Sequence, residues 1–131
     1  MGKNLAGVWN ADLSRSRFIG PSPKGLTVKI SQVGPEITEE ILVTRRDGSV
    51  ETVLFECRTD GQQGTIQLNG KEVRGNARWQ DGSLVIESWI QAGERTLHLC
   101  DHWSLSPNGN TLSMEHINDD LAGQLTVLDR A

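Results

Sequence analysis

Asp101 and His116 are the two residues of this chain best suited to chemistry, because their spacing can bring them together. If the segments that carry them pair as a hairpin across the turn at 106–110, Asp101 lies directly opposite His116, within hydrogen-bonding reach. A carboxylate that fixes the tautomer of an imidazole is the arrangement that general-base catalysis uses. The same two groups can also form a buried ion pair that satisfies itself or bridges through water. The sequence leaves both interpretations open.

A second group of candidate ligands alternates along the strand that carries Asp101. His98, Cys100 and His102 share one face, and neighbouring side chains on a strand can chelate zinc. The pattern predicts that this face points to solvent, with His98 directly across from Glu87 on the paired strand. No fourth ligand is evident, and exposed sites lack the outer contacts that orient metal ligands. We therefore expect a solvated His–Glu pair, and neither a metal nor another cofactor.

Composition narrows the class of protein. The chain has 131 residues, which suits one domain spanning 1–131, and its formal net charge is −4 with Lys and Arg scattered along it. Without a basic stripe, we expect no nucleic-acid partner. No apolar run approaches the roughly 18 residues of a membrane span. Glycine-rich phosphate loops, nucleophile elbows and Cys-x-x-Cys motifs are absent, and two cysteines do not make a disulfide framework.

The compartment and the assembly state stay open. Residues 1–4 lead directly into the first predicted strand and carry no apolar signal-peptide core. This favours a cytoplasmic protein as the chain stands, or an exported one if a signal has been removed. We expect a monomer or a weak homodimer.

Regularly spaced turn signals predict the elements that must position these side chains. Asn-Gly and Asp-Gly pairs supply the positive φ angles of tight hairpins, and here they recur about every ten residues. Successive hairpins at this spacing indicate an antiparallel meander, and closure of the meander removes its exposed edges. The prediction is an all-β, up-and-down barrel of eight to ten strands, with a two-sheet sandwich as the alternative. The predicted strands are 6–13, 25–33, 36–45, 50–58, 63–68, 71–80, 83–91, 94–105, 110–118 and 123–129.

Hairpin register separates an inner face from an outer one. A two-residue turn at Asp81-Gly82 pairs Trp79 with Leu84 on an apolar face, and Arg74 with Trp89 on a polar face. Successive turns agree on one apolar interior, which is strong support for it. The further predicted inner pairs are Ala77–Ile86, Val73–Ile90, Ile86–Leu99, Ser88–Leu97, Leu84–Asp101, Ile66–Val73, Phe55–Ile66, Trp103–Met114, Val43–Val53 and Glu39–Cys57.

Motifs at the two ends of the chain resemble the lipocalin and fatty-acid-binding (calycin) superfamily. Gly7-Val8-Trp9 on the first strand is followed by a loop with two prolines, and the last strand ends Leu128-Asp129-Arg130. The resemblance implies that Trp9 closes the barrel floor and that Arg130 packs over it. The stretches 5–24 and 105–112 also resemble small exported bacterial lipocalin-like proteins of unknown function.

Two features depart from that pattern. Fatty-acid-binding proteins carry an Arg-x-Tyr pair on the last strand that holds the ligand carboxylate, whereas this chain has Leu125-Thr126-Val127-Leu128 there. They also have a helical lid after the first strand, and residues 14–25 are too short and too rich in Pro and Gly for two helices. Fatty acid is therefore a doubtful ligand even if the barrel is right.

Three functions fit this barrel. The first is binding of a small, mostly apolar molecule, because polar groups that converge in an apolar pocket orient ligands. The second is a small-barrel isomerase, lyase or hydrolase with His116 as base and Asp101 as its orienting group. The third is an interaction module with a solidly packed interior.

The inner face supplies the candidate site. We expect Trp9 to lie in the interior and Trp89 on the exterior. The candidate ligand-binding residues are Trp79, Trp103, Met114, Phe55, Leu99, Glu39 and Ser88.

Overall fold

The computed structural model describes residues 3–18, 21–60, 64–118 and 121–131. All of the regular structure in these residues is β-strand. The ten strands are β1 (Gly7–Ala11), β2 (Gly25–Val33), β3 (Glu36–Thr44), β4 (Val50–Arg58), β5 (Gly64–Leu68), β6 (Lys71–Gln80), β7 (Ser83–Ala92), β8 (Arg95–Leu105), β9 (Thr111–Asn118) and β10 (Leu121–Arg130).

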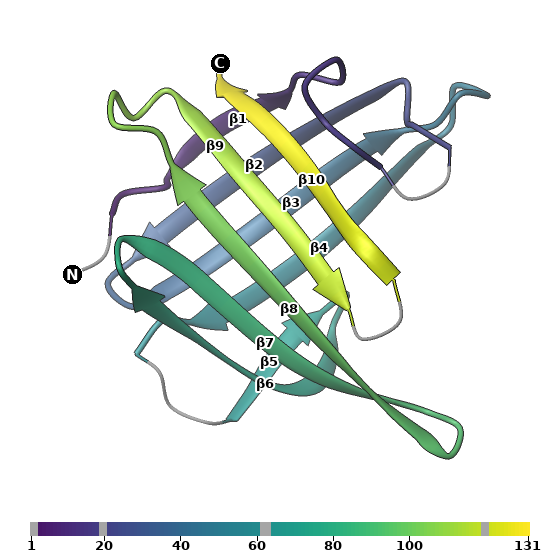
Figure 1. Cartoon of the computed structure of the whole chain (residues 1–131), viewed down its shortest axis with the longest axis vertical. Coiled ribbons are helices and arrows are strands. Elements are labelled where there is room, and N and C mark those ends of the chain that lie inside the picture. The colour runs from purple at the N-terminus through teal and green to yellow at the C-terminus, as the bar shows by residue number, and fades with distance from the viewer. Residues whose placement is uncertain (1–2, 19–20, 61–63, 119–120) are drawn as a thin grey trace.

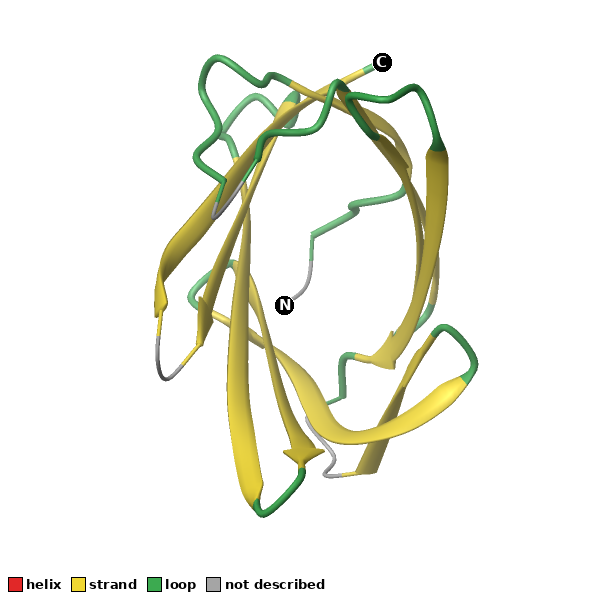
Figure 2. Ribbon diagram, turned by 90° about the vertical axis from the view of Figure 1, so that its right-hand side faces the viewer, coloured by secondary structure: helices red, strands yellow, loops and turns green. Residues whose placement is uncertain are grey.

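The strands form one closed antiparallel barrel. Each strand pairs with its neighbours in sequence, and β1 pairs with β10 to complete the ring (Figure 1). Seen from the side in Figure 2, the strands curve round a common interior. The predicted up-and-down barrel is therefore confirmed with ten strands, and the two-sheet sandwich is excluded. The pairing between β4 and β5 is the shortest in the barrel, with only Phe55–Leu68 and Glu56–Gln67 in register among the described residues.

The hairpins around β6 follow directly from their turn residues. Asn69 and Asp81 adopt φ = 52°, and the glycines that follow them have φ = 80° and 82°. Positive φ at both central residues is the type I′ geometry, which matches the twist of the flanking strands. The predicted pairs Ile66–Val73 and Trp79–Leu84 form in the structure.

Three predicted registers are wrong, each by two residues. Across β7 and β8, Ile86 pairs with Asp101, where the sequence predicted Leu99, because the turn is Gly93-Glu94 rather than Ala92-Gly93. The other two connections are five residues long, so the turn dipeptide does not fix the register. The observed pairs there are Glu39–Phe55 and Ile41–Val53 between β3 and β4, and Phe55–Leu68 between β4 and β5.

These shifts leave the inner and outer faces as predicted. Side chains alternate between faces with a period of two, so a shift of two returns every residue to its own face. The hairpin of β8 and β9 has the predicted register, with Asp101 opposite His116 and Trp103 opposite Met114. The buried interior is made by Leu5, Trp9, Val28, Ile30, Ile37, Cys57, Ile66, Ala77, Leu84, Ile86, Trp103, Leu112 and Leu128.

Trp9 and Arg130 close one end of the barrel. Trp9 is fully buried, its indole N–H donates to the carbonyl of Leu5, and the Arg130 guanidinium lies 4.2 Å from its ring centroid. Gly7 makes this possible, since it has φ = 139° and a Cβ there would lie 2.7 Å from Arg130 Nη1. The sequence prediction that Arg130 packs over Trp9 is thus confirmed.

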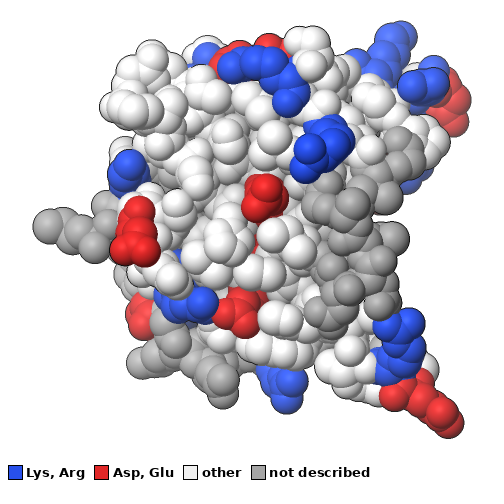
Figure 3. All heavy atoms as spheres, viewed as in Figure 1, with Lys and Arg blue, Asp and Glu red and all other residues white. Residues whose placement is uncertain are grey.

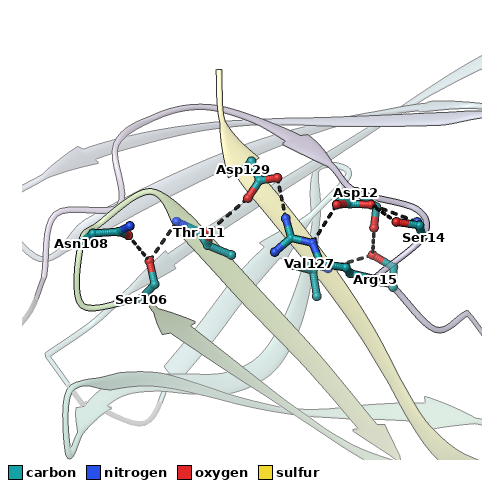
Figure 4. Close-up of polar contacts among 9 residues, drawn as sticks. Asp12, Ser14, Arg15, Ser106, Asn108, Thr111, Val127 and Asp129 are labelled. Atoms are coloured by element: carbon teal, nitrogen blue, oxygen red, sulfur yellow. Dashed lines mark hydrogen bonds and ion pairs between the residues drawn. The ribbon is translucent and has the colours of Figure 1, made fainter.

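A network of polar contacts ties the segment after β1 to the last strands (Figure 4). Asp12 accepts hydrogen bonds from Ser14 and Arg15, which lower the pKa of its carboxyl to about 2. Arg15 also pairs with Asp129, which accepts a hydrogen bond from the Thr111 hydroxyl. β1 therefore ends at Ala11, two residues earlier than predicted, because Asp12 begins this turn.

The surface carries charges of both signs. On the face drawn in Figure 3, Lys and Arg side chains alternate with Asp and Glu and do not merge into a continuous basic patch. Such interspersed charge provides no extended positive field for a polyanion. Within the described residues there is also no helix of the length and hydrophobicity that crossing a membrane requires.

Candidate ligand-binding cavity

The barrel interior contains a cavity of about 450 Å³. This volume falls in the range typical of small-molecule sites. It lies among the inward-facing side chains of β2 to β10. The lining residues are Leu26, Val28, Glu39, Ile41, Val53, Phe55, Ile66, Leu68, Val73, Ile86, Ser88, Ile90, Leu99, Asp101, Trp103, Met114, His116, Gln124 and Thr126.

Most of the wall is apolar. Phe55, Leu99, Trp103 and Met114, which the sequence placed in the site, all line the cavity. The rings of Phe55 and Trp103 lie 6.2 Å apart at 55°, a tilted arrangement that aromatic pairs favour. Trp79 does not line the cavity; it is half-buried beside the core, opposite Leu84.

Glu39 is the most deeply buried charged side chain of the wall. It is 3% exposed, and its Oε2 has no hydrogen-bond partner. Burial, with the charge of Asp101 as a lesser cause, raises the pKa of this carboxyl to about 8. An acid in this setting is neutral near pH 7 and holds an unused hydrogen-bonding position inside the cavity.

Asp101 and His116 meet on the wall as the sequence predicted. Asp101 Oδ1 and His116 Nδ1 form a hydrogen bond between β8 and β9. This bond raises the pKa of His116 above its ordinary value, against the opposing effect of burial. The imidazolium and the carboxylate therefore compensate each other's charge, and Glu39 adds a second acidic group near them.

The remaining polar side chains of the cavity wall are uncharged. Ser88 and Thr126 are buried, and Gln124 lines the cavity beside them. Sequence reasoning named Ser88 but missed the two β10 residues, although their alternation with outward-facing Leu125 is a signal that could have found them. On β10 the wall therefore presents a threonine and an amide to the cavity.

No basic side chain other than His116 reaches the cavity. All 13 Lys and Arg residues of the chain belong to the part that the structure describes, and none of them lines the cavity. The nearest equivalent of a carboxylate-binding group is His116, whose Nδ1 is already engaged by Asp101. The cavity therefore combines apolar walls with two acids and a single imidazole.

The second group of candidate ligands lies on the outer face. His98 Nε2 contacts Glu87 Oε2 at 3.0 Å, and Glu87 also pairs with Arg78. Trp89 stacks on His98, with Arg74 5.0 Å from the indole centroid on this surface. Among the described residues, no group of three or more His, Cys, Asp or Glu side chains could hold a metal ion.

Comparisons with known proteins find similarity in structure and none in sequence. No family model and no curated protein sequence matches the chain. A secretary abundant heat soluble protein from Ramazzottius varieornatus matches with a TM-score of 0.70 and 17% identity, over 100% of this chain and 98% of that one.

Two lipid-binding barrels are also similar. Lipid binding protein 8 from Caenorhabditis elegans has a TM-score of 0.68 at 9% identity, covering 96% of this chain and 94% of that one. Fatty-acid-binding protein 1 from Echinococcus granulosus has a TM-score of 0.65 at 12% identity, with 97% of each chain covered. The expected likeness to bacterial proteins finds no support here. What the chain shares with these structures is the fold of its closed antiparallel barrel.

Proposed function

We propose that this protein binds a small, mostly apolar molecule inside its barrel. The observation that carries the proposal is the interior cavity of about 450 Å³, with apolar walls and a few converging polar groups. Two of the similar structures are named as lipid-binding and fatty-acid-binding proteins, which agrees with it. A barrel that served only as an interaction module would have no need of such a space.

A cavity-filling substitution tests the proposal. In Ser88→Phe a ring projects from the wall into the cavity, and in Thr38→Phe the same ring stands exposed on the outside of β3. The probe is the neutral fluorophore N-phenyl-1-naphthylamine, titrated into each protein. We expect the first variant to weaken binding at least about tenfold and the second to leave it unchanged.

A second cavity-filling variant and the wild-type protein complete the test of ligand binding. Val53→Phe fills the cavity from β4, so it provides a second test if the Ser88 variant does not fold. Equal probe binding by the wild-type protein and by folded cavity-filled variants would mean that the probe binds elsewhere. That result, or no binding by the wild type, would overturn the proposal.

Catalysis is a second candidate, because Asp101 holds one ring nitrogen of His116 inside the cavity. An orienting carboxylate and an imidazole base are the parts that an isomerase, lyase or hydrolase of this kind needs. Hydrolysis of p-nitrophenyl acetate is a direct assay. His116→Ala would lower an enzymatic rate by about a hundredfold. His102→Ala, which changes a residue on the outer face of β8, is the control, and equal rates in the two variants would exclude His116 as the base.

A further inference from the structure

The polar end of the cavity, formed by Glu39, Asp101 and His116, is suited to bind a cation. Glu39 and Asp101 both line it, and the charge of Asp101 acts on the Glu39 carboxyl from across the barrel. Among the described residues that line the cavity, His116 is the only basic one, and it is hydrogen-bonded to Asp101. If Glu39 ionises, two carboxylates meet one imidazolium, and the site carries one uncompensated negative charge.

The unpaired atom of Glu39 indicates where a ligand group would go. A buried polar atom without a partner is costly, and native proteins rarely keep one without a reason. Glu39 Oε2 is such an atom, in a side chain that is 97% shielded from solvent and lines the cavity. A donor group on a bound molecule would satisfy it, and a cationic donor would satisfy both its hydrogen-bonding capacity and its charge.

From these observations, and resting on the ligand-binding function proposed above, we infer that the cavity takes an apolar amine. The ammonium group of the ligand lies against Glu39 and Asp101, and the apolar body lies among the aromatic and aliphatic wall residues. A carboxylate would meet two acids in the same place, with no lysine or arginine among the lining residues to hold it. Fatty acids are therefore poor ligands for this barrel.

Binding of an amine would be coupled to proton release. The neutral Glu39 acid gives its proton to solvent, and the carboxylate that remains pairs with the incoming ammonium group. Burial raises the pKa of Glu39 to about 8, so below that pH each bound ammonium ion displaces a proton. Affinity for the amine should rise as pH increases toward 8 and then level off.

The other titratable groups facing Glu39 do not replace it in this role. Burial raises the pKa of the Cys57 thiol on β4 to about 12, so this group stays neutral. Asp101 on β8 is engaged by His116 on β9, whose raised pKa keeps the imidazole protonated to a higher pH than usual. Ionisation of Glu39 is thus the step that creates the uncompensated charge.

The experiment compares three ligands that share one alkyl chain. Decylamine, decanol and decanoate are titrated into the full chain by isothermal calorimetry at pH 7, in Tris and in phosphate. We expect decylamine to bind at least about tenfold more tightly than decanoate, with decanol between them. Tris and phosphate differ in ionisation enthalpy, so the difference in heat for decylamine reports the proton that is released.

Two matched variants locate the effect. Glu39→Gln should lose the preference for the amine and the proton release, while retaining decanol. Glu40→Gln changes the next residue of β3, which points to the other face, and should behave like the wild type. Should Glu39→Gln fail to fold, the ranking of the three ligands by the wild-type protein still decides the question.

The outcomes separate the two proposals. If decanoate binds as tightly as decylamine, or if amine binding releases no proton, the amine inference is wrong while ligand binding stands. If none of the three ligands binds and the neutral fluorophore also fails, the ligand-binding function itself is wrong.

Discussion

The guanidinium of Arg130 lies flat over the buried indole of Trp9, with its central carbon 4.2 Å from the ring centroid. The same side chain donates to the carbonyl of Ala6 at 2.8 Å and to that of Gly109 at 3.2 Å. One arginine at the end of β10 therefore connects the first strand, the segment before it and the turn between β8 and β9. This contact holds the two ends of the described chain together where β1 and β10 pair.

Removing this guanidinium should destabilise the fold without touching the ligand site. Arg130→Ala loses a cation–π contact and two charge-assisted hydrogen bonds at an exposed position, and we expect a cost of about 1–2 kcal/mol. Urea denaturation followed by tryptophan fluorescence measures it. Lys29→Ala, on the exposed face of β2, is the control and should change stability little. Equal midpoints for both variants would show that the contact contributes nothing.

Gly7 should be sensitive to even one added methyl group. In Gly7→Ala the new Cβ would lie 2.7 Å from Arg130 Nη1, at a φ of 139° that side chains rarely adopt. Gly34→Ala is a matched control, because Gly34 also has positive φ but nothing lies within 4 Å of its added Cβ. We expect the Gly7 variant to be less stable by about 1–3 kcal/mol, and less stable than the control. A Gly7 variant as stable as the control would contradict this account of the Gly-x-Trp motif.

Glu39 should make the folded state less stable as pH rises. Its folded pKa of about 8 lies above its ordinary value of 4.5, so the native state binds the proton more tightly than the unfolded state. The contribution to stability is fully present below pH 4.5, is lost as pH rises through 8, and can reach a few kcal/mol. Glu39→Gln should flatten this part of the profile, whereas Glu40→Gln should retain it. Chemical denaturation at a series of pH values gives the comparison, and parallel profiles for wild type and Glu39→Gln would refute the assignment.

His116 should titrate above its ordinary pKa of 6.5 in the folded protein. The hydrogen bond that His116 Nδ1–H donates to the Asp101 carboxylate is the main cause, so Asp101→Asn should lower the His116 pKa. Because the folded value is raised, the stability that this pair contributes is present below pH 6.5 and disappears as pH rises through the folded pKa. NMR titration of the ring protons follows His116 directly. An unchanged His116 titration in Asp101→Asn would mean that the hydrogen bond is not its cause.

The sequence alone predicted the strands and their faces. Turn dipeptides such as Asn69-Gly70 and Asp81-Gly82 encode their own backbone geometry, so the hairpins they connect could be read residue by residue. Alternation then assigned Glu39, Asp101 and His116 to the interior, even where a register was displaced by two residues. Local rules sufficed here because side chains alternate between the two faces of a strand with a period of two residues. The face of a side chain is therefore the same whichever inner residue of the neighbouring strand it pairs with.

Only the tertiary structure decided how the interior is divided. Trp79 and Trp103 both fall on the predicted inner face of their strands, yet Trp103 lines the cavity and Trp79 packs against the core without reaching it. The position of a side chain along the barrel axis depends on the registers of all ten strands together. Where a connection has five residues, the turn residues do not determine the register. The proximity of Glu39 on β3 to Asp101 on β8 has the same origin, because closure of the barrel brings together side chains from strands that are not neighbours. The polar end of the cavity therefore forms only when the barrel closes, and no local pattern in the sequence predicts it.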